Sequence, residues 1–120
     1  MGAIREEIEI IGMKKSKKIL ALFDSGAYRN YIKMKLEDGD GPEDIGFHTF
    51  EGEHKVILAN GDTTVGEKVA FKEVRIKEHN IKEPRFVIME NLIEDVIIGV
   101  KLMQKLKITL DPPNKKICLK

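Results

Sequence analysis

Several residue types that mark particular protein classes are scarce in this sequence. Cys118 is the only cysteine, so an intrachain disulfide and a cysteine-based metal cluster are excluded. The three histidines have no spacing typical of metal ligands, and no metal or other cofactor is expected. No apolar run approaches the ~18 residues of a membrane span, so no membrane partner is expected either.

Charge and length narrow the possibilities further. The 120 residues carry a net charge of only +1, which gives no general electrostatic reason to bind nucleic acid. This length suits one domain, residues 1–120, with a single core. The opening residues 1–7 have no apolar stretch behind a basic segment, so the expected compartment is the cytoplasm.

The apolar pattern is mainly that of short strands. Residues 4–11 and 19–23 predict two strands joined by a turn, and residues 84–89 and 95–99 predict two more. Asn60-Gly61 stands between β-prone runs and favours a hairpin, because both central residues of a type I′ turn need positive φ.

The rest of the chain is less regular. Residues 100–106 have helical spacing and predict the one convincing helix, near the end of the chain. Residues 28–36 predict a short helix or an irregular turn. Residues 37–54 form a long acidic segment whose purpose the sequence does not reveal. We therefore expect six to eight short strands and one helix.

The segment most suggestive of chemistry is Asp24-Ser25-Gly26. Alone, this tripeptide more often serves as a turn or a helix cap. Here, however, an apolar strand leads directly to Asp24, and Gly26 follows it in a sharp turn. The carboxylate would then be held by rigid backbone at the edge of the core, as a catalytic group requires.

Three elements together resemble the retropepsin-like aspartic proteases, the family of retroviral and retrotransposon proteases and their cellular relatives. Residues 21–27 are similar to the catalytic motif, residues 57–66 to the flap hairpin, and residues 97–106 to the hydrophobic-hydrophobic-glycine element and its helix. The resemblance is strongest over residues 19–119. It implies a mainly β, closed barrel-like fold with one short helix in the C-terminal half.

The resemblance also implies roles for individual residues. Asp24, with Ser25 and Gly26, would form the catalytic motif. The residues expected to bind substrate are Ala27, Leu58, Ala59, Asn60, Gly61 and Asp62. The residues expected to support the catalytic loop are Ile97, Ile98 and Gly99.

An aspartic protease of this kind needs two carboxylates about 3 Å apart that share one proton. This sequence has only one Asp followed by Ser-Gly or Thr-Gly, at Asp24. One chain therefore cannot supply the pair, and a homodimer with one Asp24 from each subunit is expected. Its substrate would be an extended peptide or protein, cleaved by general acid-base activation of water.

Some positions depart from the retroviral pattern, and two other interpretations stay open. Tyr28 and Arg29 stand where retroviral enzymes often have acidic residues, and Val100 stands where the family often has Arg. One alternative is a dimer of the same fold that binds or assembles peptides with little or no proteolysis. The other is a β domain in which Asp24 is only a capping carboxylate.

Overall fold

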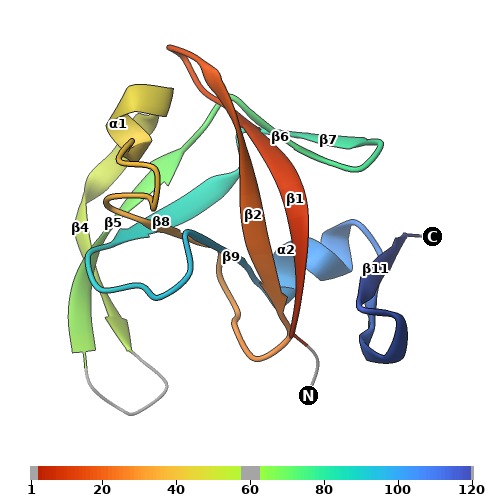
Figure 1. Ribbon diagram of the computed structural model, residues 1–120. Helices are drawn as coiled ribbons and strands as arrows, with labels where there is room; N and C mark the ends of the chain where they lie inside the picture. Colours follow the sequence, from red (N-terminus) through yellow and green to blue (C-terminus); the bar gives the residue numbers. More distant parts are fainter. Residues whose placement is uncertain (1–2, 58–62, 120) are drawn as a thin grey trace.

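A computed structural model describes residues 3–57 and 63–119 (Figure 1). The strands are β1 (Ala3–Ile11), β2 (Ser16–Asp24), β3 (Tyr31–Lys33), β4 (His48–Ile57), β5 (Thr63–Ala70), β6 (Glu73–Ile76), β7 (His79–Lys82), β8 (Arg85–Met89), β9 (Val96–Ile98), β10 (Ile108–Asp111) and β11 (Lys116–Leu119). The helices are α1 (Pro42–Ile45), α2 (Val100–Lys105) and the short 3-10 helix η1 (Pro112–Asn114). None of these described helices is long and apolar enough to cross a membrane.

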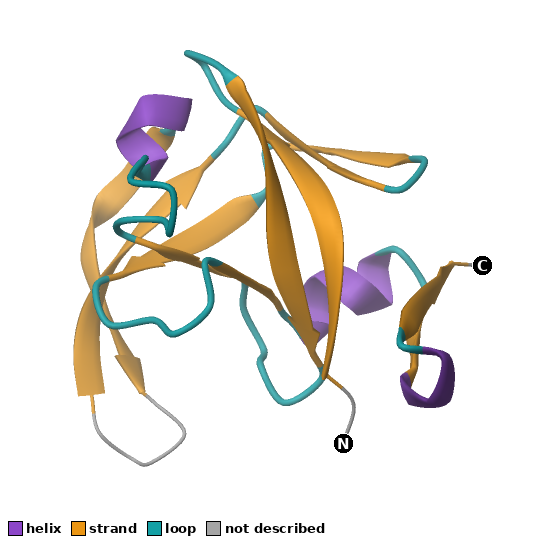
Figure 2. Cartoon of the chain, viewed as in Figure 1, coloured by secondary structure: helices purple, strands orange, loops and turns teal. Residues whose placement is uncertain are grey.

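The prediction of a mainly β fold is confirmed, and α2 lies where the helical spacing placed it (Figure 2). Several short elements were not predicted, among them β7, η1 and two others. The segment 28–36 contains strand β3, and the acidic segment 37–54 contains helix α1 before β4 begins. Both are only three or four residues long, which is too short for a periodic pattern to reveal.

The hairpin of β1 and β2 follows directly from its alternating sequence. The strands pair in register along their full length, from Ala3 opposite Asp24 to Ile11 opposite Ser16. Side chains at every second position of β2, such as Phe23, are buried, whereas Leu20 on the other face is 58% exposed. The hairpin therefore has one face in the core and delivers Asp24 to its open end.

The barrel-like sheet is not closed in the described part of the chain, which corrects the sequence-based expectation. Nine strands form one sheet in the order β4-β5-β8-β3-β9-β2-β1-β6-β7, and β4 and β7 are its two ends. Closure would need hydrogen bonds between those ends. Instead, the short β6–β7 hairpin projects away from the rest of the sheet (Figure 1). Within residues 3–57 and 63–119, the terminal strands β10 and β11 pair only with each other, as a separate two-stranded sheet.

The core between these strands is apolar throughout the described residues, where no polar or charged residue is classed as buried. Phe71 is fully buried in it, with edge-to-face contacts to Phe86 at 5.4 Å and Phe47 at 6.1 Å between ring centroids. Such packing fixes the sheet from which the loop after Asp24 emerges.

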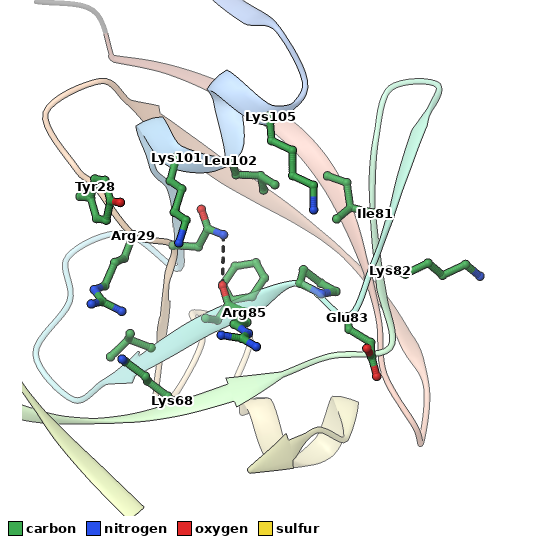
Figure 3. Close-up of a pocket in the computed structure, with 14 residues that line it drawn as sticks. Tyr28, Arg29, Lys68, Ile81, Lys82, Glu83, Arg85, Lys101, Leu102 and Lys105 are labelled. Carbon is green, nitrogen blue, oxygen red and sulfur yellow. Dashed lines mark hydrogen bonds between the residues drawn. The ribbon is translucent and has the colours of Figure 1, made fainter. Parts of the chain in front are cut away.

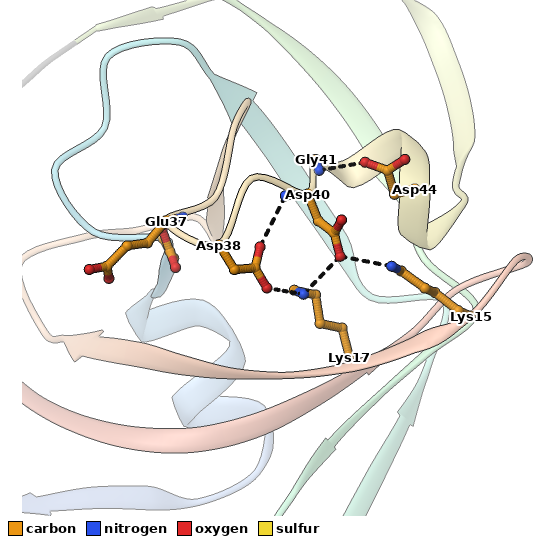
Figure 4. Close-up of polar contacts among 8 residues, drawn as sticks. Lys15, Lys17, Glu37, Asp38, Asp40, Gly41 and Asp44 are labelled. Atoms are coloured by element: carbon orange, nitrogen blue, oxygen red, sulfur yellow. Dashed lines mark hydrogen bonds and ion pairs between the residues drawn. The ribbon is translucent and has the colours of Figure 1, made fainter.

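The structure supplies a role for the start of the acidic segment. The Nζ of Lys17 forms ion pairs with Asp38 and, at 2.9 Å, with Asp40 (Figure 4). Lys15 Nζ lies 2.7 Å from the same Asp40 carboxylate. These contacts tie the loop after β3 to the β1–β2 hairpin, which carries the basic run 14–18.

The Asp40 network gives a testable dependence on pH. Hydrogen bonds from Lys15 and Lys17 lower the pKa of Asp40 from its usual 3.8 to about 2. A lowered pKa in the folded state means that the pairing stabilises the protein above about pH 4 and is lost as pH falls toward 2. In urea unfolding, we expect wild type to have a higher free energy of unfolding than Asp40→Asn at pH above about 4. This difference should shrink as the pH is lowered toward 2. An NMR titration midpoint near 4 for Asp40 would contradict the network.

Candidate active site

Asp24 is the last residue of β2 and lies at the end of a buried strand. Its Oδ1 accepts a hydrogen bond of 2.8 Å from the backbone N–H of Gly26, and its carbonyl accepts one of 3.1 Å from Ala27. Phe23 beside it is fully buried. The turn therefore holds the backbone of Asp24 through Ala27 and its carboxylate through Gly26, and the bond to Oδ1 fixes the direction of Oδ2.

The loop that follows Asp24 crosses the end of strand β9. Strand β2 runs parallel to β9, with Phe23 opposite Ile98, whereas β3 runs antiparallel to β9, with Tyr31 opposite Ile97. The chain must therefore leave β2, pass over the C-terminal end of β9 and return on its other side. This topology brings residues 24–30 against Gly99.

Gly99 lies so close to this loop that no side chain would fit. A Cβ atom built there would lie 2.3 Å from the carbonyl oxygen of Arg29 and 2.7 Å from that of Tyr28. The backbone of Gly99 has a φ of −93°, which any residue can adopt, so lack of space is the reason for glycine.

Helix α2 holds the same loop through its first N–H groups. The N–H of Val100 donates to the carbonyl of Ala27 at 2.7 Å, and that of Lys101 donates to the carbonyl of Tyr28 at 3.3 Å. These N–H groups have no partner inside the helix, so the loop satisfies them. The loop and the helix are thereby locked together at the end of β9.

The structure thus brings together most of the residues predicted for the site. The residues 24–27 of the loop after β2 lie against the element 97–99, where Ile98 is buried and Ile97 is partly buried. The predicted substrate-binding residues Leu58, Ala59, Asn60, Gly61 and Asp62 lie outside the described residues. Strands β4 and β5 on either side of them pair as an antiparallel hairpin as far as Ile57 and Thr63.

Asn30 also belongs to this site, although the sequence did not single it out. Its Oδ1 accepts a hydrogen bond of 2.9 Å from the N–H of Gly99, and its Nδ2 donates one of 3.1 Å to the carbonyl of Arg85. Its own carbonyl accepts the N–H of Val87 at 2.9 Å. Asn30 therefore joins the loop to β8 and β9. In the sequence Asn30 is a single amide residue after a turn, and such a residue predicts only that the turn continues.

Chemically, the arrangement presents a carboxylate on rigid backbone at the edge of an apolar core. Such a group can act as a general base or acid when a water molecule or a second carboxyl group faces it. Asp24 is partly buried, and both Ser25 and Gly26 are exposed beside it. The loop is therefore open to a reacting partner from outside the chain.

Comparison with known proteins agrees with this geometry. The family described as aspartyl protease matches residues 8–102, which is more than half of the chain. A comparison with curated proteins found no match.

Solved structures share the fold at low sequence identity. The retroviral protease-like domain of Ddi1 from Leishmania major is 13% identical, with a TM-score of 0.61, covering 100% of this chain and 90% of that one. A retropepsin-like aspartic protease from Rickettsia conorii is 16% identical, also with a TM-score of 0.61, covering 92% of this chain and 75% of that one. The family match, together with Asp24 at the end of β2 and this shared retropepsin-like fold, shows that the chain belongs to the aspartyl protease family.

Proposed function

We propose that this protein is an aspartic endopeptidase that acts as a homodimer, with the Asp24 carboxylates of two subunits forming its catalytic pair. The observation that carries the proposal is the rigid placement of Asp24 in the loop over β9 of a chain from the aspartyl protease family. Extended peptides are the proposed substrates.

The requirement for two chains follows from the chemistry. Two carboxyl groups about 3 Å apart share one proton because both cannot ionise cheaply at that distance. Only Asp24 is followed by Ser-Gly in this sequence, so one chain supplies half of the pair. A two-fold axis beside the exposed Ser25 and Gly26 would bring the second Asp24 to the first.

The proposed reaction is a hydrolysis in which the carboxyl groups only move protons. The ionised Asp24 takes a proton from water as the water oxygen attacks the carbonyl carbon of the peptide bond. The protonated Asp24 gives its proton to the carbonyl oxygen. The Asp24 that took the water proton then passes it to the amide nitrogen, and the C–N bond breaks. A hydroxyl of the intermediate returns a proton to the other Asp24 as the free carboxyl and the free amine leave.

The proposed substrate contacts lie on two sides of this pair. Ala27 would contact the peptide from below, and residues 58–62 would cover it from above. An extended peptide in such a site forms strand-like hydrogen bonds with its main chain, and its side chains alternate between pockets.

Dilution tests the two-chain site directly. We expect the rate of peptide hydrolysis per mole of chain to fall as the protein is diluted below its dimer dissociation constant, because dimers are lost by mass action. Analytical ultracentrifugation over the same concentrations should show the dimer disappearing in parallel. Hydrolysis by a monomer at constant specific activity would overturn the homodimeric mechanism, and peptide binding without hydrolysis would favour the binding-module alternative.

A further inference from the structure

A cavity of about 390 Å³ lies next to the active-site loop, on the side of helix α2 (Figure 3). Its wall is formed by the loop residues 28–30, by β5, by the segment 81–87 and by the outer face of α2. The mechanism proposed above does not use this cavity.

Positive charge is concentrated around the cavity. Its lining includes one carboxylate, Glu83, and six cationic side chains, which are Arg29, Lys68, Lys82, Arg85, Lys101 and Lys105. The whole chain carries a net charge of only +1, so this is a strong local excess. A cavity of this kind attracts anionic groups.

Four of these cations are available to a ligand. Lys82 is paired with Glu73 at 3.1 Å and points away from the cavity in Figure 3. By contrast, no ion pair to another described residue is found for Arg29, Lys68, Lys101 or Lys105.

Lys101 and Lys105 form one wall of positive charge. They are four residues apart on α2, and in Figure 3 both side chains extend from the helix toward the cavity. Like charges at this spacing repel each other, so the helix alone gains nothing from the pair. Lys101 also lies over the ring of Tyr28, with its Nζ 5.8 Å from the ring centroid.

The floor of the cavity is apolar. Ile81, Phe86, Val87 and Leu102 line it and are buried. A glutamate side chain matches this combination, because its methylene groups would contact the floor while its carboxylate reaches the lysines.

The position of the cavity relates it to the substrate. Arg29 is five residues after Asp24, so their Cα atoms are at most about 18 Å apart. An extended peptide rises ~3.3 Å per residue, so a side chain of the substrate about five residues from the cleaved bond would reach this distance.

We infer that this cavity binds an acidic side chain of the protein substrate within about five residues of the cleaved bond, an inference that rests on the proposed function. A homodimer would carry one such cavity per subunit, so acidic residues on either side of the cleaved bond would be recognised. A nucleic acid fits less well, because the cavity is small and the rest of the chain is nearly neutral.

The test uses two synthetic peptides with the same apolar centre, flanked on both sides by either glutamates or glutamines. Binding of the fluorescein-labelled peptides to the Asp24→Asn protein is measured by anisotropy at pH ~6, where glutamate is ionised. We expect the glutamate peptide to bind about five- to tenfold more tightly at low salt, as two exposed ion pairs would give. The preference should vanish near 1 M salt.

Two sets of substitutions locate the effect. Lys101→Gln with Lys105→Gln should bring the ratio of the two affinities close to one. The matched control is Lys14→Gln with Lys35→Gln, which removes the same charge from exposed positions outside the cavity lining and should keep the ratio. If the double cavity variant does not fold, Lys105→Gln alone should still reduce the ratio of the affinities for the glutamate and glutamine peptides to half of its wild-type value or less.

Hydrolysis by the wild-type protein separates this inference from the proposed function. Tight binding of the glutamate peptide with no cleavage of either peptide would support the cavity and overturn the protease. Equal kcat/KM and equal affinity for the two peptides would overturn the cavity and leave the protease intact. The inference would also be overturned if the preference for the glutamate peptide survived the cavity substitutions. The same holds if a thymidine oligonucleotide displaced the labelled glutamate peptide at a lower concentration than unlabelled glutamate peptide does.

Discussion

Asp24→Asn is expected to lower kcat for peptide hydrolysis by about a thousandfold or more, because the amide can neither take a proton from water nor share one with its partner. The fold should survive. Asn keeps the Oδ1 atom that accepts the Gly26 N–H at 2.8 Å, and it has nearly the same size as Asp. Circular dichroism and thermal unfolding should therefore match wild type while turnover of a fluorogenic peptide is lost.

Asp44→Asn is a closely matched control for this variant. Asp44 also accepts a backbone N–H through its carboxylate, from Gly41 at 2.7 Å (Figure 4). It lies on α1, which is away from the loop over β9 (Figure 1). The same atomic change there should leave kcat unaltered. Full activity of the Asp24→Asn protein would remove Asp24 from the mechanism.

Mixing wild type with the Asp24→Asn variant extends the experiment to the dimer. When equal amounts of wild type and the Asp24→Asn variant exchange subunits at random, only about one quarter of the dimers contain two wild-type chains. If both carboxyl groups are needed, activity per wild-type chain should fall to about half of its unmixed value after exchange. Unchanged activity per wild-type chain at full exchange would mean that one Asp24 is sufficient.

Local pattern was enough to predict the strand that carries Asp24. Alternating burial defines the β1–β2 hairpin, and the glycine turn after Asp24 ends it, so neighbouring residues contain all the information needed. The position of β9 between β2 and β3 is a different matter. The pairing of β2 with β9 places Phe23 opposite Ile98, which is far along the chain, and only the family resemblance pointed to this pairing.

Apart from short elements such as β3 and α1, the features that sequence reasoning missed depend on contacts between distant residues. Asp40 and its lysine partners are more than twenty positions apart, so the sequence does not show which basic residues pair with the acidic segment. Asn30 contacts Arg85 and Gly99, which are still farther along the chain. Hydrogen bonds of single side chains leave no periodic trace, whereas the packing of strands does.

Gly99→Ala is expected to be strongly destabilising. The new Cβ would meet the Arg29 carbonyl oxygen at 2.3 Å, and it would also lie 2.7 Å from the carbonyl carbon and oxygen of Tyr28. These are backbone atoms, and the hydrogen bond from Val100 to Ala27 keeps the loop against the helix. Relief therefore requires the loop to move, at a cost of about 3 kcal/mol. The melting temperature should fall by about 10 °C.

The same movement should damage catalysis, which distinguishes Gly99 from a glycine needed only for a turn. A displacement of about 1 Å in the loop would misplace Asp24 and could lower kcat about a hundredfold, measured at a temperature where the variant is folded. Gly39→Ala is the control, because Gly39 has a φ of +98° but no atom within 4 Å of its added Cβ. That change should cost about 1 kcal/mol through backbone strain and leave kcat intact. If Gly99→Ala proved as stable and as active as Gly39→Ala, the close approach of the loop to β9 could not be what positions Asp24.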